Sequence, residues 1–183
     1  MPSISWHSLR PGSPPTTISA PEIRPAVASD LEAVRAIYNE GIEDRIATLD
    51  ASPKSPDDMA DWWGQHEGFP VVVATEAGRV LGWASLNRFS GRCAHADIAD
   101  LSVYVARSQR GRGIGAQLLR ALEASAVSAS FHKIVLHALD ANEWGKRLYR
   151  KAGFTEIGIF REHGMLDGRR VDVIAMEKII QVR

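Results

Sequence analysis

The sequence predicts a single α+β domain built on a mixed sheet. The chain has 183 residues, which is about the size of one domain. Several short segments alternate apolar and polar residues at strand spacing, and longer stretches between them have helical spacing. No internal repeat or linker divides this region. Strands grouped around interspersed helices are typical of an α+β domain with a mixed sheet.

The N-terminal part of the domain predicts one strand and two helices. Residues 23–27 are a short strand candidate. Residues 29–32 (Ser-Asp-Leu-Glu) have the spacing of a capping box, so an amphipathic helix is expected from there to about Gly41. Residues 55–58 (Ser-Pro-Asp-Asp) form a second cap with proline at the first helical position. This second helix is expected to end near Gly68.

The remainder predicts most of the sheet and two further helices. Turns are expected at Gly78 and at 167–168 (Asp-Gly). A short helix is expected over 142–151, closed by Gly153. Strand patterns occur at 70–75, 80–86, 98–105, 133–138, 155–160 and 171–178. From Gly113 the apolar residues switch to helical spacing, and one face consists of Ile114, Leu118, Leu119, Leu122 and Ala126.

Composition argues against several classes of protein. Lys plus Arg and Asp plus Glu number 22 each, so no overall field attracts nucleic acid or an anionic membrane. No apolar run approaches the roughly 20 residues that span a bilayer. Cys93 is the only cysteine, which excludes an internal disulfide and suits a cytoplasmic protein. Residues 1–20, rich in Ser, Pro and Thr, are expected to be a flexible tail, which leaves 21–183 as the domain.

The segment from Arg110 to Ala116 (RGRGIGA) predicts a phosphate-binding loop between a strand and a helix. Glycines let backbone N–H groups converge because no Cβ blocks the approach. At a helix N-terminus those donors are unpaired, and the helix dipole favours negative charge. Arg110 and Arg112 add positive charge. The alternative interpretation is a turn whose glycines only permit a tight connection.

Two other phosphate motifs fit this segment less well. A Walker loop requires GxxxxGK[ST], and the chain has no such run. The dinucleotide pattern GxGxxG/A is formally met by Gly111, Gly113 and Ala116. That pattern normally follows its strand directly and opens a βαβ unit, whereas here a polar link intervenes and two helices precede it. By its own chemistry the loop does not distinguish coenzyme A from a dinucleotide.

The loop resembles the Q/R-x-x-G-x-G/A motif of the GNAT N-acetyltransferase superfamily, with Arg110, Gly113 and Gly115 at its defined positions. The resemblance covers about residues 23–178 and includes the strand Ser102–Val105, Asn142, Leu148-Tyr149 and Gly153-Phe154. Other segments resemble the branch of phosphinothricin, methionine sulfoximine and arsinothricin N-acetyltransferases: Tyr38-Asn39-Glu40, Ile46-Ala47-Thr48, Arg92 and Val171-Asp172-Val173.

This resemblance implies a GNAT fold, whose central sheet has about seven mostly antiparallel strands with flanking helices, and acetyl-CoA as cosubstrate. Asn142 would hydrogen-bond the pantetheine arm, although the small hydroxyl residue usual three positions later is Gly145 here. The main chain of Val103, Tyr104 and Val105 would pair with the same arm. Backbone donors to the pyrophosphate would come from Gly111, Arg112, Gly113, Gly115 and Ala116.

The resemblance also implies direct attack of an amine on the thioester within a ternary complex. Asp100 stands where the branch usually carries Glu, and it is the candidate base, acting through water because Asp is one methylene shorter. Tyr149, where the branch often has His, is the candidate acid for the leaving thiolate. The alternatives are a solvent-facing carboxylate at a strand end and a tyrosine that only packs on its helix.

Substrate binding is expected from Glu40 and Arg92. Glu40 would hold the ammonium group or act as an alternative base, and Arg92 would bind a carboxylate or phosphinate. The other interpretations are a solvated helix terminus and a surface arginine. No metal is expected, because the histidines lack metal-ligand spacing. Among them, His95 and His163 lie nearest to the expected pocket segments.

The resemblance therefore implies a homodimeric N-acetyltransferase for a small amino-acid-like amine of the phosphinothricin type, with no nucleic acid or membrane partner. One alternative is acetylation of another amine, such as a polyamine, an aminoglycoside or a protein N-terminus. Another is an acyl-CoA sensor without turnover, against which Asp100 and Tyr149 argue.

Overall fold

Seven strands form one mixed sheet in the computed structural model, which describes residues 20–180. Along the chain the strands are β1 (Glu22–Pro25), β2 (Val71–Glu76), β3 (Arg79–Arg88), β4 (Ile98–Val105), β5 (Lys133–Leu139), β6 (Thr155–Leu166) and β7 (Arg169–Ile179). Their order in the sheet is β1-β2-β3-β4-β5-β7-β6, and every neighbouring pair is antiparallel except β4 and β5. The predicted α+β class and mostly antiparallel sheet are confirmed. The predicted tail, apart from residue 20, lies outside the described residues.

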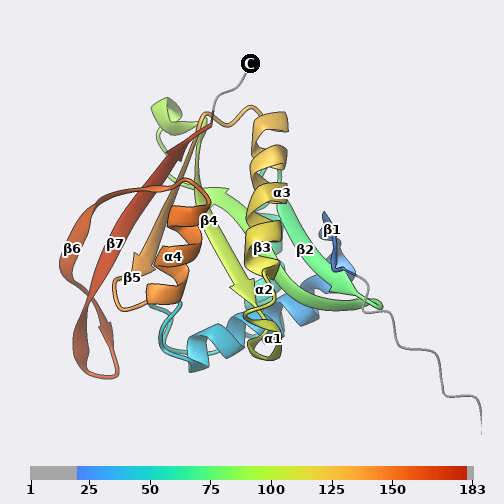
Figure 1. Ribbon diagram of the computed structural model, residues 1–183, viewed down its shortest axis with the longest axis horizontal. Coiled ribbons are helices and arrows are strands. Elements are labelled where there is room, and N and C mark those ends of the chain that lie inside the picture. Colours follow the sequence, from blue (N-terminus) through green and yellow to red (C-terminus); the bar gives the residue numbers. More distant parts are fainter. Residues whose placement is uncertain (1–19, 181–183) are drawn as a thin grey trace, which may run out of the picture.

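The four α-helices cover both faces of the sheet and are α1 (Leu31–Glu43), α2 (Pro56–Gly64), α3 (Ile114–Ser128) and α4 (Glu143–Lys151). Figure 1 shows α3 and α4 in front of the sheet, with α2 behind it. The apolar face predicted for α3 is confirmed, since its five residues are each at most 1% exposed. On the opposite face, α1 and α2 pack on a second cluster that includes Val73 and Trp83. Within the described chain, no helix is both long and apolar enough to cross a membrane.

Alternation along β4 assigns each of its side chains to one of these faces. Ala99 and Leu101 belong to the cluster beneath α3, whereas Tyr104 packs with the cluster beneath α1. Successive side chains of a strand point to opposite faces. Asp100 and Ser102 therefore face the side of α1 and α2.

The parallel contact between β4 and β5 is short. It joins residues 98–100 to residues 133–135, and no register pair follows Asp100 and Val135. Beyond this point β4 remains paired with β3 up to Val105, and β5 remains paired with β7 up to Leu139. The two halves of the sheet thus diverge and open a gap between the end of β4 and the end of β5 (Figure 1).

The first capping box was predicted wrongly, whereas the second is confirmed. A 3-10 turn over Ala28–Asp30 precedes α1, and the Asp30 carboxylate accepts the Val27 N–H at 2.9 Å. Asp30 also forms an ion pair with Arg24 of β1 at 2.7 Å, a partner that local spacing does not reveal. In α2, the Ser55 hydroxyl accepts the N–H of the residue three positions on, as predicted, but the helix ends at Gly64 instead of near residue 68.

The core assignment of α3 predicts a large loss of stability in Leu122→Ala. Leu122 is 1% exposed, so truncation leaves a cavity and should lower the free energy of unfolding by about 2–5 kcal/mol. Val127 on the same helix is 38% exposed, and Val127→Ala should change the free energy of unfolding by less than about 0.5 kcal/mol. Urea denaturation followed by circular dichroism measures both. Equal stability of the two variants would contradict the burial of this face.

Candidate active site

A cavity of about 230 Å³ lies where β4 and β5 diverge. It is lined by both strands, by the start of α4 and by the loop between α1 and α2. Three residues expected from the sequence to act in the site, Asp100, Asn142 and Tyr149, meet there. Val103 and Tyr104 also line it, on the part of β4 that has no register partner on β5. A strand edge without a partner fits an extended ligand arm that pairs with main chain.

The glycine-rich loop has the backbone that the sequence predicts for an anion site. Gly111 and Gly113 have φ values of 80° and 77°, a left-handed region that favours glycine. Gly113 precedes the first turn of α3, and no side chain caps that turn. A Cβ on Gly115 would lie 3.1 Å from the Leu148 side chain, so this turn packs closely on α4. The free N–H groups and the helix dipole fit a pyrophosphate.

The two loop arginines are both paired with carboxylates. Arg110 forms an ion pair with Asp44 at 2.6 Å and donates from Nε to the Val105 carbonyl at 3.1 Å. Arg112 pairs with Glu76 at the end of β2 at 2.8 Å. Their positive charge is therefore partly neutralised within the protein, and they anchor the loop to α1 and β2. The backbone N–H groups of the loop therefore remain as the unpaired donors that an anion could bind.

The structure does not bring Glu40 and Arg92 together with Asp100. The Glu40 carboxylate accepts the Arg107 N–H at 2.6 Å, which fastens the end of α1 to the connection between β4 and α3. Arg92 precedes the 3-10 turn Cys93–His95 in an exposed loop. Neither side chain lines the cavity at the strand divergence or a neighbouring cavity between α1 and α2.

Tyr149 lies on α4 with its ring in the main core cluster and its surface lining the cavity. It is 9% exposed. Burial raises the pKa of its phenol, and the nearby negative charge of Asp100 raises it further. The phenol therefore keeps its proton at neutral pH and remains available as a proton donor.

Asn142 lines the same cavity and caps the N-terminus of α4. Its side-chain oxygen accepts the Gly145 N–H at 2.9 Å. A Cβ on Gly145 would lie only 2.8 Å from the Asn142 amide nitrogen. A residue with a Cβ at position 145 would therefore require the Asn142 amide to shift from its present position.

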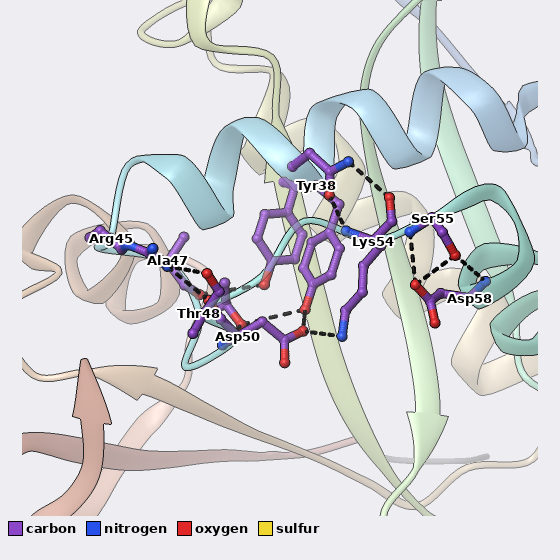
Figure 2. Close-up of polar contacts among 11 residues, drawn as sticks. Tyr38, Arg45, Ala47, Thr48, Asp50, Lys54, Ser55 and Asp58 are labelled. Carbon is purple, nitrogen blue, oxygen red and sulfur yellow. Dashed lines mark hydrogen bonds and ion pairs between the residues drawn. The ribbon is translucent and has the colours of Figure 1, made fainter. Parts of the chain in front are cut away.

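A second cavity of about 290 Å³ adjoins the first and shares Tyr38 and Ser102 with it. It lies between α1, α2 and the loop that joins them, and its polar lining includes Asp50 and Lys54. Figure 2 shows the Tyr38 hydroxyl, the Asp50 carboxylate and the Lys54 ammonium group in one connected row. Asp50 and Lys54 thus place a pair of opposite charges beside the cavity at the strand divergence.

Tyr38 is the centre of that polar row. Its hydroxyl donates to Asp50 at 2.6 Å, and burial together with the Asp50 contact raises the pKa of Tyr38 to about 12. Lys54 pairs with Asp50 at 3.0 Å, and its main chain exchanges hydrogen bonds with the Asn39 side chain. The α1–α2 loop is therefore held in a defined position over the sheet.

Sequence reasoning missed His137 of β5, and it favoured His95 and His163 instead. His137 lines the cavity, and its Nδ1 lies 3.4 Å from a carboxylate oxygen of Asp100. The hydrogen bond and charge of Asp100 raise the pKa of His137 above its usual value. The alternation of β5 identifies which of its side chains share a face, but the register of β5 against β4 is what places this one beside Asp100.

Comparison with known proteins agrees with this geometry. The Acetyltransferase (GNAT) family profile matches residues 33–154. The chain is 30% identical to phosphinothricin N-acetyltransferase of Streptomyces coelicolor, over 86% of this chain and 95% of the relative. It is 32% identical to an L-methionine sulfoximine/L-methionine sulfone acetyltransferase of Pseudomonas paraeruginosa, over 85% and 92%.

A similar solved structure is a protein of the same superfamily with acetyl-CoA bound. A GNAT superfamily phosphinothricin acetyltransferase from Sinorhizobium meliloti, in complex with acetyl-CoA, has a TM-score of 0.83 and 30% identity, covering 88% of this chain and 89% of that one. The chain belongs to the GNAT acetyltransferase family. It is an acetyl-CoA-dependent N-acetyltransferase, as the loop and strand motifs predicted.

The loop geometry predicts that Gly113→Ala weakens acetyl-CoA binding. An L-residue in the left-handed region costs about 1–2 kcal/mol, so the loop should relax away from its present shape and lose roughly tenfold in affinity. Titration calorimetry with acetyl-CoA measures the loss. Gly78→Ala is the matched control, because Gly78 has a similar φ of 76° in the β2–β3 turn. An affinity lowered equally in both variants would contradict a specific role of the loop.

Proposed function

We propose that this protein transfers acetyl from acetyl-CoA to the α-amino group of a small amino-acid-like compound of the phosphinothricin, methionine sulfoximine or arsinothricin type. The observation that carries the proposal is the junction of two cavities at Tyr38 and Ser102. One cavity holds Asp100 and Tyr149 beside the free edge of β4, and the other offers Lys54 to an acidic group. The relatives named for phosphinothricin and methionine sulfoximine support the same substrate class.

In this proposal acetyl-CoA is a substrate that supplies the acetyl group as an activated thioester. The loop of Gly111, Gly113 and neighbouring residues binds the pyrophosphate through backbone N–H groups. The free edge of β4 orients the pantetheine arm, and a backbone N–H near Val103 polarises the carbonyl. Much of the rate comes from holding the amine and the carbonyl in one geometry.

The proton transfers are assigned to the two sides of the cavity. Tyr149 is the acid, because its raised pKa keeps the phenol protonated until a thiolate needs the proton. Asp100 provides the negative charge on the base side, on the face of β4 that looks toward α1 and α2. An α-amino group has a pKa of about 8, so the base has a modest task near neutral pH.

Lys54 is proposed to bind the carboxylate of the acceptor, in the place that the sequence suggested for Arg92. Its ammonium group faces the second cavity, and its present partner Asp50 is held by Tyr38 as well. An entering carboxylate would share the ammonium group with Asp50. The paired charges suit a zwitterionic acceptor better than a polycation such as an aminoglycoside.

The protein is further proposed to act in the cytoplasm as a homodimer that assembles through β6. This strand ends the sheet, and its apolar side chains Ile157, Phe160 and Met165 are 59%, 46% and 49% exposed. An edge strand with exposed apolar residues favours pairing with another chain. Resistance to a toxic amino-acid analogue is the biological role that such an activity suggests.

An acceptor panel tests the proposal directly. The wild-type protein should release thiol from acetyl-CoA with phosphinothricin or methionine sulfone, and much less with spermidine, kanamycin or an Ala-terminated peptide. Tyr149→Phe should lower kcat by about 10²-fold or more, because the leaving sulfur loses its proton donor. Its acetyl-CoA affinity should be unchanged, which separates the chemical step from binding. Thiol release with none of these amines would refute the proposed function.

Lys54→Met tests the carboxylate contact. Loss of a charged hydrogen bond worth about 1.5–3 kcal/mol should raise the KM for methionine sulfone at least tenfold. The main-chain bonds of Lys54 to Asn39 do not depend on the replaced side chain, so the loop keeps its anchor. The amide of methionine sulfone, which has no carboxylate, is the control acceptor. If KM for the acid and for the amide rises equally, the assignment of Lys54 is wrong.

A further inference from the structure

The pair formed by Asp100 and His137 bridges the gap where β4 and β5 separate. Val135 is the last register partner of Asp100, and His137 lies two residues further along β5, on the same face. The distance from His137 Nδ1 to the Asp100 carboxylate is 3.4 Å. A neutral imidazole that donates its Nδ1–H to a carboxylate presents Nε2 as an acceptor. Both side chains line the cavity that also contains Tyr149.

We propose that Nε2 of His137 takes the proton from the acceptor's amine, and that Asp100 acts through His137 as a positioning residue. Asp100 would fix the tautomer of the imidazole and stabilise the imidazolium that forms. The inference rests on the proposed function and refines its base. It replaces the water expected between a short aspartate and the amine with a side chain of this protein.

The side-chain geometry explains why the imidazole is the better proton acceptor. Asp100 is held at the start of the divergence, and its side chain is 33% exposed. His137 is 44% exposed, so its ring is the more accessible member of the pair. The hydrogen bond and charge of Asp100 raise the pKa of the His137 ring, which makes the ring a stronger base than an isolated imidazole. A stronger base takes a proton from an ammonium or amine nitrogen more readily.

The proton balance of the step uses two residues. As the neutral amine forms the new C–N bond and the C–S bond breaks, Nε2 of His137 takes the surplus proton of the nitrogen. The Tyr149 phenol gives its proton to the departing sulfur. The imidazolium then loses its proton to solvent, and the tyrosinate regains one. The sum is amine plus thioester giving amide plus thiol, with the enzyme restored.

The groups around His137 leave Asp100 as its main electrostatic partner. On β7 its register neighbour is Ala175, and the next residue on that face, Glu177, is paired with Lys133. On β6 the nearest ring is Phe160, and His163 stacks on the Phe160 ring. From α4 and α1, the phenols of Tyr149 and Tyr38 line the same cavity, and both have raised pKa values. These phenols are uncharged near neutral pH.

A histidine titration by NMR gives a readout that does not depend on turnover. The protein has six histidines, and the signal missing in His137→Gln identifies His137. Its pKa in the free wild-type protein should lie above the usual value of about 6.5. Asp100→Asn removes the negative charge, so the pKa of His137 should fall. An unchanged pKa in Asp100→Asn would overturn the pairing.

The pH dependence of kcat/KM with methionine sulfone tests the chemistry. The base must be neutral, so the rate should rise with pH through the pKa of His137, and this rise should move to lower pH in Asp100→Asn. His137→Gln should lose about 10²–10⁴-fold at neutral pH and follow only the ionisation of the free amine. His132→Gln is the matched control, because His132 is exposed and lines neither cavity.

The outcomes separate this inference from the proposed function. Retention of wild-type kcat/KM and its pH dependence in His137→Gln would overturn the inference while leaving the acetyltransferase activity in place. A far larger loss in Asp100→Asn than in His137→Gln would assign the proton to the carboxylate itself. Absence of thiol release by the wild-type protein would refute the proposed function instead. Acetyl-CoA affinity, expected to be equal in all variants, reports on folding.

Discussion

The divergence of β4 from β5 is the constraint on which the site depends. Each strand keeps its antiparallel partner on the other side, β3 for β4 and β7 for β5, so the sheet separates without loss of those ladders. The edge of β4 beyond Asp100 is left with main-chain groups that β5 does not use. Buried backbone groups need partners, so such an edge favours a ligand that supplies them. The same opening admits Tyr149 from α4 and His137 from β5 to one cavity.

Charge pairing inside the protein fixes the position of the glycine-rich loop from Arg110 to Ala116. Arg110 and Arg112 are paired with Asp44 and Glu76, which leaves backbone N–H groups at the start of α3 as the free donors. Exposed ion pairs of this kind contribute little to stability, but they fix where the loop lies. Because Asp44 and Glu40 stand at the end of α1, the loop is fastened to the helix whose Tyr38 lines the second cavity. The glycine-rich loop and the second cavity are thus connected through α1.

The titratable groups of the cavity differ in environment, and that difference is the basis of the roles proposed for them. Tyr149 is buried, which favours its neutral, proton-donating form. His137 is half-exposed beside a carboxylate, which raises the pKa of its ring. Groups whose environments push their pKa values apart define an acid side and a base side. The proposed mechanism uses Tyr149 as the acid and His137 as the base.

The sequence by itself determined the local features: the alternation of the strands, the apolar face of α3, the cap at Ser55 and the glycine loop, because each depends on residues close together in the chain. It also indicated the GNAT family through motifs of the same local kind. Only the tertiary structure decided that Glu40 binds Arg107, that Asp30 binds Arg24 and that His137 meets Asp100. These contacts join separate elements, and their partners depend on strand register and on the point where two strands part, which no local pattern records.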